Sequence, residues 1–431
     1  MERKISKELI KWRENIYRKP LILQGARQVG KTYALLEFGR KYYDNISYIN
    51  FEVSEEFKDV FENDISPEKL IPRLSRLTNE TITKERTLII FDEVQLCERA
   101  LTSLKYFCEF APEYHIIASG SLLGIAVNRA KFSFPVGKVD RLTLYPMDFE
   151  EFLWALEEKT LVEEIRKCFD TNMPMDKVYH NILLDYYRKY LVVGGMPEAV
   201  TKYADTKDYI LVRLAQQGIL SGYMDDMSKY NTNNEIKKTR LVYNNITVQL
   251  SKKNTKFQYK IVKTGGRASE LENAIEWLEL TGIIDRCYRT EQIKKPLENY
   301  RDIDSFKIYM SDVGLLCAKK EIKAEDIIFM VPALNDFKGG MTENYVSNQL
   351  LVNGYGSYYW ASDATAEIDF IINRDDDIIP IEVKSADNMQ AKSLKTFMDR
   401  YKPKYAIKIS EKNFGFEDNK KTIPLYAAFC I

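Results

Sequence analysis

Short apolar runs alternate with helical patterns along the first third of the chain. The runs with the pattern of buried or half-buried strands are 21–23, 46–52, 88–91, 114–118 and 142–145. Residues 1–20 and 31–41 instead place apolar side chains at helical spacing. Strands that alternate with helices in this way predict a parallel sheet with helices on both faces.

The rest of the chain shows two further patterns. From 148 to 230 the apolar positions are helical, with one break at Gly194-Gly195-Met196-Pro197 that we interpret as a helix-ending turn. Residues 236–292 combine short helices with an apolar strand and resemble a winged-helix module. An α/β pattern then returns, with strands expected at 306–310, 357–360, 367–373, 378–384 and 404–409 and helices at 341–353 and 389–401.

A phosphate-binding pattern directly follows the first expected strand. The pattern G-x-x-x-x-G-K-[ST] is present there as Gly25, Ala26, Arg27, Gln28, Val29, Gly30, Lys31 and Thr32. Its glycines let backbone N–H groups close around the β- and γ-phosphates of a nucleotide, at the positive end of the following helix. Lys31 supplies a positive charge to these phosphates, and the Thr32 hydroxyl can bind Mg²⁺. The strand before the loop and the helix after it favour this function over a chance match in a glycine turn.

An acidic pair further along the chain is the expected partner of this loop. Asp92 and Glu93 end a buried strand. There, Asp92 would hold Mg²⁺ through water, and Glu93 would polarise the water that attacks the nucleotide. The alternative is an acidic pair that only caps the next helix. The presence of the phosphate loop favours the catalytic role.

Polar residues after the next strand are candidates for contact with the γ-phosphate. Ser119 and Ser121 flank a glycine at the end of that strand, and each can reach the nucleotide or cap a helix. We assign Ser121 to the nucleotide site. An arginine is also expected to stabilise the transition-state charge, and Arg129 and Arg141 are the candidates by position.

These motifs together resemble a known family. Residues 21–154 are similar to the AAA-type ATPase domain of a widespread bacterial and archaeal family, in the stretches GARQVGKT, IIFDEVQ, ASGSLL and VGKVDRLTLYPMDFEEFL. The stretches YLVVGGMPEAV and FKIYMSDVGLL resemble the middle and C-terminal signatures of the same family. The resemblance thus extends over nearly the whole chain. It implies that the nucleotide is ATP.

Two strands near the C-terminus carry acids and a lysine. Residues 367–373 and 378–384 are expected to form a hairpin, with Asp369 on the first strand and Glu382 and Lys384 on the second. Glu382 and Lys384 are two positions apart and would project from the same face. Two carboxylates and a lysine suit metal-dependent cleavage of phosphodiester bonds, because the acids bind Mg²⁺ and the lysine positions the attacking water.

Further residues bear on this second site. Glu343, on the helix expected before the hairpin, can add a metal ligand. The arrangement resembles the PD-(D/E)XK, or restriction-endonuclease-like, fold, and the ATPase family is similar in carrying such a domain. The alternative is a structural charge pair on a solvated strand. Apolar flanks typical of central strands, and the small residues Ala366 and Ser385 beside the acids, favour the catalytic site.

Composition narrows the class of protein. Sixty-three basic and 63 acidic residues balance, so no global field directs the chain to nucleic acid. The six cysteines lack zinc-site spacing, and with only two histidines any metal is expected to have carboxylate ligands, which suits Mg²⁺. The charged N-terminus has no signal-peptide pattern, and no apolar run approaches the roughly 18 residues of a membrane span. We therefore expect a cytoplasmic protein without a membrane partner.

The fold class predicted is α/β: a P-loop sheet with a helical lid, a winged-helix-like middle domain and a nuclease-like C-terminal domain. The expected domains are 1–150 (ATPase core), 151–232 (helical lid or linker), 233–300 (winged-helix-like) and 301–431 (restriction-endonuclease-like).

The leading hypothesis is a hydrolase with ATP and Mg²⁺ as cofactors, whose nucleotide cycle controls a nuclease-like domain that acts on DNA. One alternative is an ATP-switched regulatory or binding protein whose C-terminal domain is catalytically silent. Another is a chaperone-like remodeller of protein partners. Oligomerisation is compatible with all three.

Overall fold

The chain forms two compact units in a computed structural model that describes residues 1–121, 135–229, 233–252, 256–362, 366–384 and 392–431. The first unit comprises Met1–Tyr145 with Leu280–Gly282. The second comprises Pro146–Glu279 and Ile283–Ile431. Among the described residues, no helix combines the length and the apolar character needed to span a membrane.

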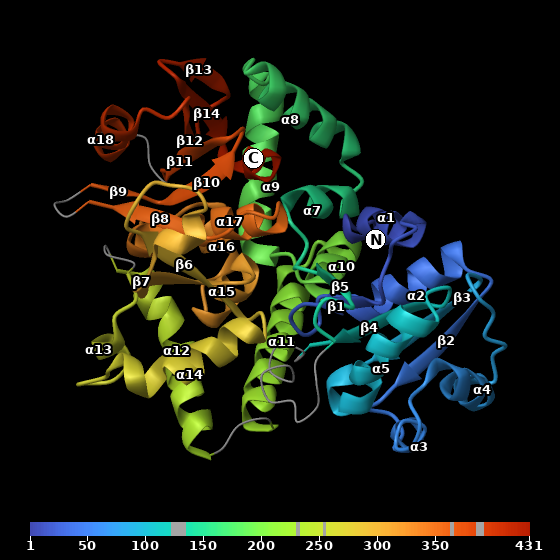
Figure 1. Cartoon of the computed structure of the whole chain (residues 1–431). Helices are drawn as coiled ribbons and strands as arrows, with labels where there is room; N and C mark the ends of the chain where they lie inside the picture. The colour runs from blue at the N-terminus through green and yellow to red at the C-terminus, as the bar shows by residue number, and fades with distance from the viewer. Residues whose placement is uncertain (122–134, 230–232, 253–255, 363–365, 385–391) are drawn as a thin grey trace. The chain divides into compact units, whose positions relative to one another are not determined.

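A five-stranded parallel sheet forms the centre of the first unit (Figure 1). Its strands are β1 (Leu21–Gln24), β2 (Asn45–Asn50), β3 (Thr87–Asp92), β4 (His115–Gly120) and β5 (Asp140–Thr143). Their order in the sheet is β2-β3-β4-β1-β5, and each neighbouring pair is parallel. The helices of this unit are α1 (Ile5–Glu14), α2 (Lys31–Tyr42), α3 (Glu56–Asp59), α4 (Pro67–Thr78), η1 (Val94–Leu96) and α5 (Glu98–Phe110).

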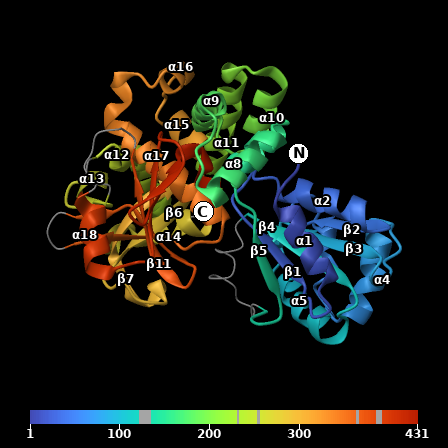
Figure 2. The same ribbon diagram turned by 90° about the horizontal axis from the view of Figure 1, so that it is seen from above.

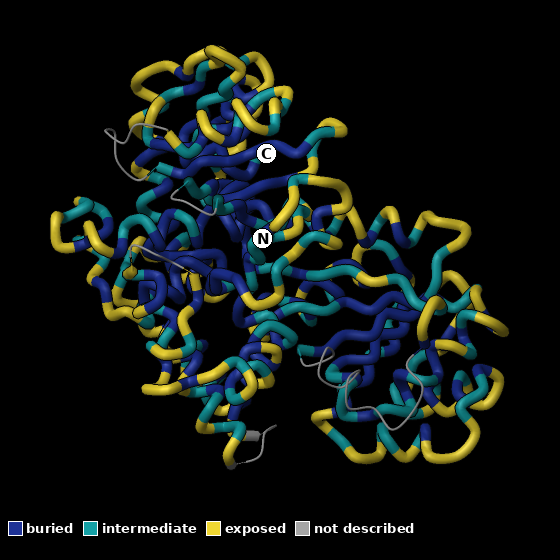
Figure 3. Tube along the Cα trace, turned by 60° about the vertical axis from the view of Figure 1, so that its left-hand side comes forward, coloured by how far each residue is buried: buried dark blue, intermediate teal, exposed yellow. Residues whose placement is uncertain are grey.

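Helices cover both faces of this sheet (Figure 2). Ile89 and Phe91 of β3 belong to the hydrophobic core that the sheet shares with α4 and α5. Leu88 points to the opposite face, where it approaches Gly39 of α2. The strands β3 and β4 are buried along their whole length, whereas the loops around them are largely exposed (Figure 3). This is the predicted α/β arrangement of a P-loop sheet.

Two boundaries in the first unit differ from the predicted ones. α1 ends at Glu14 rather than before Pro20, because Asn15 leaves the helical conformation and its side chain accepts a hydrogen bond from the Tyr17 N–H. β5 pairs with β1 over Asp140–Thr143, slightly earlier than predicted. The predicted segment 142–145 is the more apolar one, but the backbone pairing begins at Asp140.

The second unit begins with helices. They are α7 (Phe149–Ala155), α8 (Lys159–Thr171), α9 (Lys177–Val193), α10 (Pro197–Thr206), α11 (Tyr209–Lys229), α12 (Asn233–Leu250), α13 (Tyr259–Val262) and α14 (Ala268–Leu280). Later in the chain follow η2 (Leu297–Tyr300), α15 (Val313–Lys319), α16 (Ala324–Ile328), η3 (Pro332–Leu334), α17 (Asn335–Val352), α18 (Lys392–Tyr401) and η4 (Leu425–Cys430).

Two sheets complete this unit. The first has the order β7-β6-β8-β9 and consists of β6 (Ile284–Thr290), β7 (Arg301–Met310), β8 (Tyr358–Ala361) and β9 (Glu367–Ile368). The second has the order β10-β11-β12-β14-β13 and consists of β10 (Phe370–Arg374), β11 (Asp377–Val383), β12 (Ala406–Ser410), β13 (Gly415–Glu417) and β14 (Lys420–Pro424). It is mixed, because β12 is parallel to β11 and β14 while the outer pairs are antiparallel.

The strand predicted at 367–373 is divided between these two sheets. Glu367 and Ile368 pair with β8, and the residues from Phe370 onward pair with β11. The division falls at Asp369, whose carboxylate accepts a hydrogen bond from the Val383 N–H at 2.7 Å. The chain thus changes sheets at a residue that was predicted to lie in the middle of one strand.

The segment that resembles a winged helix ends in β6, which pairs antiparallel with β7 beyond the segment. The hairpin is not a free wing, because Tyr288 and Arg289 of β6 also pair in parallel with Tyr358 and Tyr359 of β8. A winged-helix fold therefore stays a prediction.

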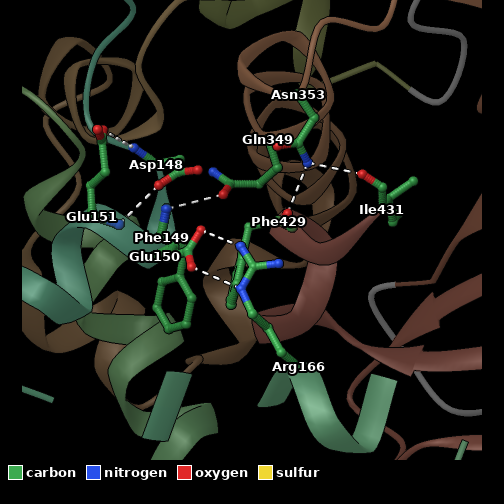
Figure 4. A network of polar contacts seen from close by, with 9 residues as sticks. All are labelled: Asp148, Phe149, Glu150, Glu151, Arg166, Gln349, Asn353, Phe429 and Ile431. Carbon is green, nitrogen blue, oxygen red and sulfur yellow. Dashed lines mark hydrogen bonds and ion pairs between the residues drawn. The ribbon is translucent and has the colours of Figure 1, made fainter. Parts of the chain in front are cut away.

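The start of α7 is tied to the C-terminal part of the chain (Figure 4). Asp148 caps the helix by accepting from the Glu151 N–H at 2.9 Å, within a capping box. The Phe149 N–H donates to Gln349 Oε1 of α17 at 3.0 Å. The helices that were predicted to form a lid thus begin inside the same compact unit as the C-terminal strands.

Two more contacts in Figure 4 extend this network. Arg166 of α8 donates to both oxygens of the buried Glu150 carboxylate, at 2.9 and 2.6 Å, and its guanidinium lies over the Phe429 ring. The Asn353 amide donates to the carbonyl oxygens of Phe429 and Ile431, at 2.8 and 3.0 Å. The network joins residues that are far apart in the sequence.

The glycine turn after α9 is held by an aspartate. Asp312, buried at the N-cap of α15, accepts hydrogen bonds from the N–H groups of Gly195 at 2.5 Å and Leu315 at 2.7 Å. Gly194 has a φ of 70° and lies so close to the Asp312 carboxylate that a Cβ atom would overlap it. The stretches YLVVGGMPEAV and FKIYMSDVGLL, two of those that carry the family resemblance, therefore meet in space.

Candidate functional site

The predicted phosphate loop lies between β1 and α2. Gly25 has a φ of 150°, and a Cβ atom there would overlap the carbonyl oxygen of Leu144. Gly30 has a φ of 90° at the N-cap of α2, a left-handed conformation that L side chains rarely adopt. Both positions of the motif therefore require glycine for steric reasons. The first N–H groups of a helix have no acceptor within the helix, so the loop before α2 is suited to bind an anion.

Lys31 is folded over this loop. Its side chain is buried, and Nζ donates to the carbonyl oxygens of Gly25 at 3.0 Å and Ala26 at 2.8 Å. Burial lowers the pKa of the Lys31 ammonium to about 8, while the nearby carboxylates of Glu93 and Asp92 oppose this shift. An ammonium held by two neutral carbonyl groups can exchange them for phosphate oxygens, which are stronger partners.

Three hydroxyl groups converge on Asp92 at the end of β3. Thr32 Oγ1 donates to Oδ2 at 2.7 Å, and Tyr48 donates to the same oxygen at 2.9 Å. Ser119 Oγ donates to Oδ1 at 2.5 Å. The threonine of the loop and the acid of β3 are therefore adjacent, as an Mg²⁺ site in a P-loop protein requires. Both offer the hard oxygen ligands that Mg²⁺ prefers, so the residues fit this ion.

Glu93 lies next to this group in a left-handed backbone conformation, with a φ of 52°. Burial raises the pKa of its carboxyl above the ordinary value, and the charge of Asp92 adds to the effect. Gln95 Nε2 donates to Glu93 Oε2 at 2.5 Å and orients it. A positioned carboxylate with a raised pKa is suited to accept a proton from water.

The other residues predicted for this site occupy different places. Ser119, rather than Ser121, contacts the acid, because Ser119 is on β4 between β1 and β3, while Ser121 lies beyond the strand. Arg141 is on β5, paired with Ile22. Arg129 lies outside the described residues. The roles of Ser121 and Arg141 stay predictions.

Sequence reasoning missed Tyr48. It is on β2, next to β3 in the sheet, and also accepts a hydrogen bond from Asn50 Nδ2 at 3.2 Å. The signal was present in the alternation of β2, which places Tyr48 and Asn50 on one side of the strand. No motif marks a tyrosine at this position.

The second predicted site lies in the second unit. Glu382 is 2% exposed, and its Oε1 accepts from Lys384 Nζ at 2.9 Å. Its Oε2 is buried and has no hydrogen-bond partner among the described residues. Asp369 faces the same stretch of β11 through its hydrogen bond with Val383. Burial raises the pKa of Asp369 to about 7, with a further contribution from the charge of Glu343. The structure therefore brings Asp369, Glu382 and Lys384 together. Ser385 lies outside the described residues.

A lysine that sequence reasoning missed is also present there. Lys307 of β7 is 1% exposed and pairs with Glu367 Oε1 at 2.6 Å and Glu343 Oε2 at 3.3 Å. Tyr309 also donates to Glu343 Oε2, at 2.8 Å. We call the set of four acids and two lysines the C-terminal cluster; its members are Lys307, Glu343, Glu367, Asp369, Glu382 and Lys384.

The C-terminal cluster does not have the geometry of a metal centre. In the described part of the chain, no group of three or more His, Cys, Asp or Glu residues is arranged to hold a metal ion. Glu343, predicted as a ligand, is already bound to Lys307 and Tyr309. A metal site at Glu343, Asp369 and Glu382 therefore does not fit this arrangement.

Comparison with known families assigns the first unit. Residues 17–153 match the AAA domain family. Residues 184–326 and 338–428 match two domains of unknown function, DUF8612 and DUF4143. With its phosphate loop and parallel sheet, the first unit has the α/β fold of a P-loop NTPase and is an AAA-type ATPase domain. This confirms the prediction for that unit. The nuclease-like fold of the C-terminal residues stays a prediction.

Several solved structures are distantly similar. A Walker-type ATPase of Pyrococcus abyssi is 14% identical over 74% of this chain and 95% of its own, with a TM-score of 0.45. The ORC2 protein of Aeropyrum pernix, in ADPNP–ADP complexes, is 12% identical over 76% and 92%, with a TM-score of 0.36. No curated protein is significantly similar to the chain. TM-scores this low carry no information on partners.

Proposed function

We propose that the first unit binds and hydrolyses ATP with Mg²⁺. The observation that carries this proposal is the 2.7 Å hydrogen bond between Thr32 and Asp92, which joins the phosphate loop to the acidic strand end. Lys31 would leave the carbonyl groups of its own loop to bind the β- and γ-phosphates. Thr32 and Asp92 would hold the magnesium ion, directly or through water, and the ion would neutralise charge that develops on the phosphates.

Glu93 is the residue proposed to act on water. Its raised pKa favours acceptance of the proton that the attacking water loses, and Gln95 holds the carboxylate in place. Ser119 and Tyr48 would act through Asp92, because both hydroxyl groups donate to it.

ATP turnover by purified variants tests this proposal. We expect Lys31→Ala to abolish hydrolysis and to weaken nucleotide binding. Glu93→Gln should retain binding and lose turnover, because the amide cannot accept the proton. Lys41→Ala is a matched control, since Lys41 is an exposed lysine near the end of α2. Turnover of Lys31→Ala equal to that of the control would refute the proposal.

For the second unit we propose a binding or regulatory role switched by ATP, rather than cleavage of DNA. The proposal is supported by the C-terminal cluster, in which lysines already pair with the acids predicted to bind metal. Cleavage assays with Mg²⁺ on linear, branched and single-stranded DNA, with and without ATP, test it. Cleavage that is lost in a Glu382→Ala, Lys384→Ala double variant would restore the nuclease hypothesis.

The class of partner is a separate question, on which the sequence left DNA and protein open. Stimulation of ATP turnover by DNA would favour a DNA partner. Turnover that is unaffected by DNA would favour a chaperone-like role on proteins.

A further inference from the structure

Lys307 is a buried lysine that forms ion pairs with two acids of the C-terminal cluster. It enters from β7, while its partners come from α17 (Glu343) and β9 (Glu367). Three elements that are remote in sequence thus direct one ammonium and two carboxylates to the same point. The Lys307 side chain is 1% exposed and its Nζ lies 5.1 Å from the centre of the Tyr359 ring, whereas the side chains of Glu343 and Glu367 are 16% and 40% exposed.

An ammonium at this depth is stable only because of its acidic partners. Lys307 Nζ lies 2.6 Å from Glu367 Oε1 and 3.3 Å from Glu343 Oε2, so two carboxylates compensate its charge. Removal of the lysine would leave Glu343 and Glu367 without this counter-ion.

The remaining acids of the cluster are also partly satisfied. Lys384 pairs with Glu382 Oε1, and the Val383 N–H donates to Asp369 Oδ2. A divalent ion that entered beside Lys307 would meet a like charge. Within the described residues, Glu382 Oε2 is the one carboxylate oxygen of the cluster that is both buried and without a hydrogen-bond partner.

We infer that Lys307 is the resident cation of the C-terminal cluster and replaces a divalent metal there. The cluster therefore holds its acids together without Mg²⁺, and its residual acceptor, Glu382 Oε2, is suited to a ligand that donates a hydrogen bond rather than to a metal ion. The inference rests on the proposed absence of metal-dependent cleavage and is independent of ATP hydrolysis.

Binding of Mn²⁺ to the nucleotide-free protein tests this inference, because the phosphate loop holds its metal together with a nucleotide. Titration followed by the EPR signal of free Mn²⁺ should show no site in the wild type. Lys307→Met removes the ammonium but keeps the apolar stem length, and this variant should show an Mn²⁺ site that the wild type lacks. Adding Glu343→Gln to it should abolish the gain.

Lys338→Met is the matched control, because Lys338 is another ion-paired lysine of the second unit, bound to Glu411 at 3.1 Å. It should gain no Mn²⁺ site. A wild type that binds Mn²⁺ in a manner lost in Glu382→Gln would overturn the inference, as would a folded Lys307→Met that binds none.

Folding of the variant can itself be measured. If Lys307→Met is unstable, we expect Mn²⁺ to raise its unfolding temperature and to leave that of the wild type unchanged; equal shifts would contradict the inference. DNA cleavage by the wild type without any Mn²⁺ site would instead refute the proposed silence of the second unit. The two failures are therefore distinguishable.

Discussion

Replacement of Gly195 by alanine would place a methyl group against the backbone of Met147. The added Cβ would lie closer than 3.0 Å to the Met147 carbonyl oxygen, which must move. That oxygen accepts from Tyr190 at 2.6 Å, and the Met147 N–H donates to Gly195 at 2.7 Å. Two buried hydrogen bonds at about 1 kcal/mol each, with an overpacking cost of about 1–3 kcal/mol, give a destabilisation of roughly 3–5 kcal/mol. The Gly195 N–H bond to Asp312 is also at risk.

Urea unfolding followed by tryptophan fluorescence measures this effect, with thermal unfolding as a second assay. A loss of this size corresponds to a fall of roughly 10 °C in unfolding temperature for a unit of this length. Gly218→Ala is the matched control, because Gly218 is in α11 and a methyl group added there would meet no neighbouring atom within 4 Å. It should be neutral or stabilise by about 0.5–1 kcal/mol. Equal unfolding midpoints for the two variants would refute the packing argument.

Two further predictions concern single side chains. Tyr48→Phe removes one of three hydroxyl donors to Asp92, so ATP turnover should fall by roughly tenfold. Thr32→Ala should cause a larger loss, because it also removes the hydroxyl proposed to bind magnesium. An equal or larger loss for Tyr48→Phe would contradict this order. Burial raises the pKa of Asp285 from 3.8 to about 7, so the folded state holds this proton more tightly than the unfolded chain. The stabilisation is complete below pH 3.8 and is lost as the pH rises through about 7. As the pH rises from 3.8 to about 7, the wild type should lose stability that Asp285→Asn does not lose, so the unfolding midpoint of the variant should rise relative to that of the wild type. A difference between the two midpoints that stays constant with pH would show that Asp285 does not titrate as proposed.

The N-terminal unit was largely predictable because its signals are local. The phosphate loop combines steric and chemical requirements in eight consecutive residues, and the buried strand before Asp92 is a continuous apolar run. A parallel sheet then places the ends of β1, β3 and β4 side by side, which explains the contacts of Thr32 and Ser119 with Asp92. Tyr48 escaped prediction because a tyrosine in a strand is usually a packing residue.

The C-terminal cluster was only partly predictable. The i, i+2 spacing of Glu382 and Lys384 is local, and their ion pair follows from it. The pairing of Lys307 with Glu343 and Glu367 depends on how β7, α17 and β9 pack, which no short pattern encodes. The sheet change at Asp369 is equally non-local, because it is coupled to a hydrogen bond with β11.

The buried network around Asp148 has a consequence for how this protein can be divided. Hydrogen bonds join α7 to α8 and α17, and the chain from Pro146 onward, apart from Leu280–Gly282, forms one compact unit that includes two family matches. A gene fusion or a recombination event that joined a foreign ATPase domain at residue 233 or 301 would remove Phe149, whose N–H donates to Gln349. A junction between Tyr145 and Pro146 would preserve these contacts, and a domain exchanged there must also accommodate Leu280–Gly282, which belong to the first unit.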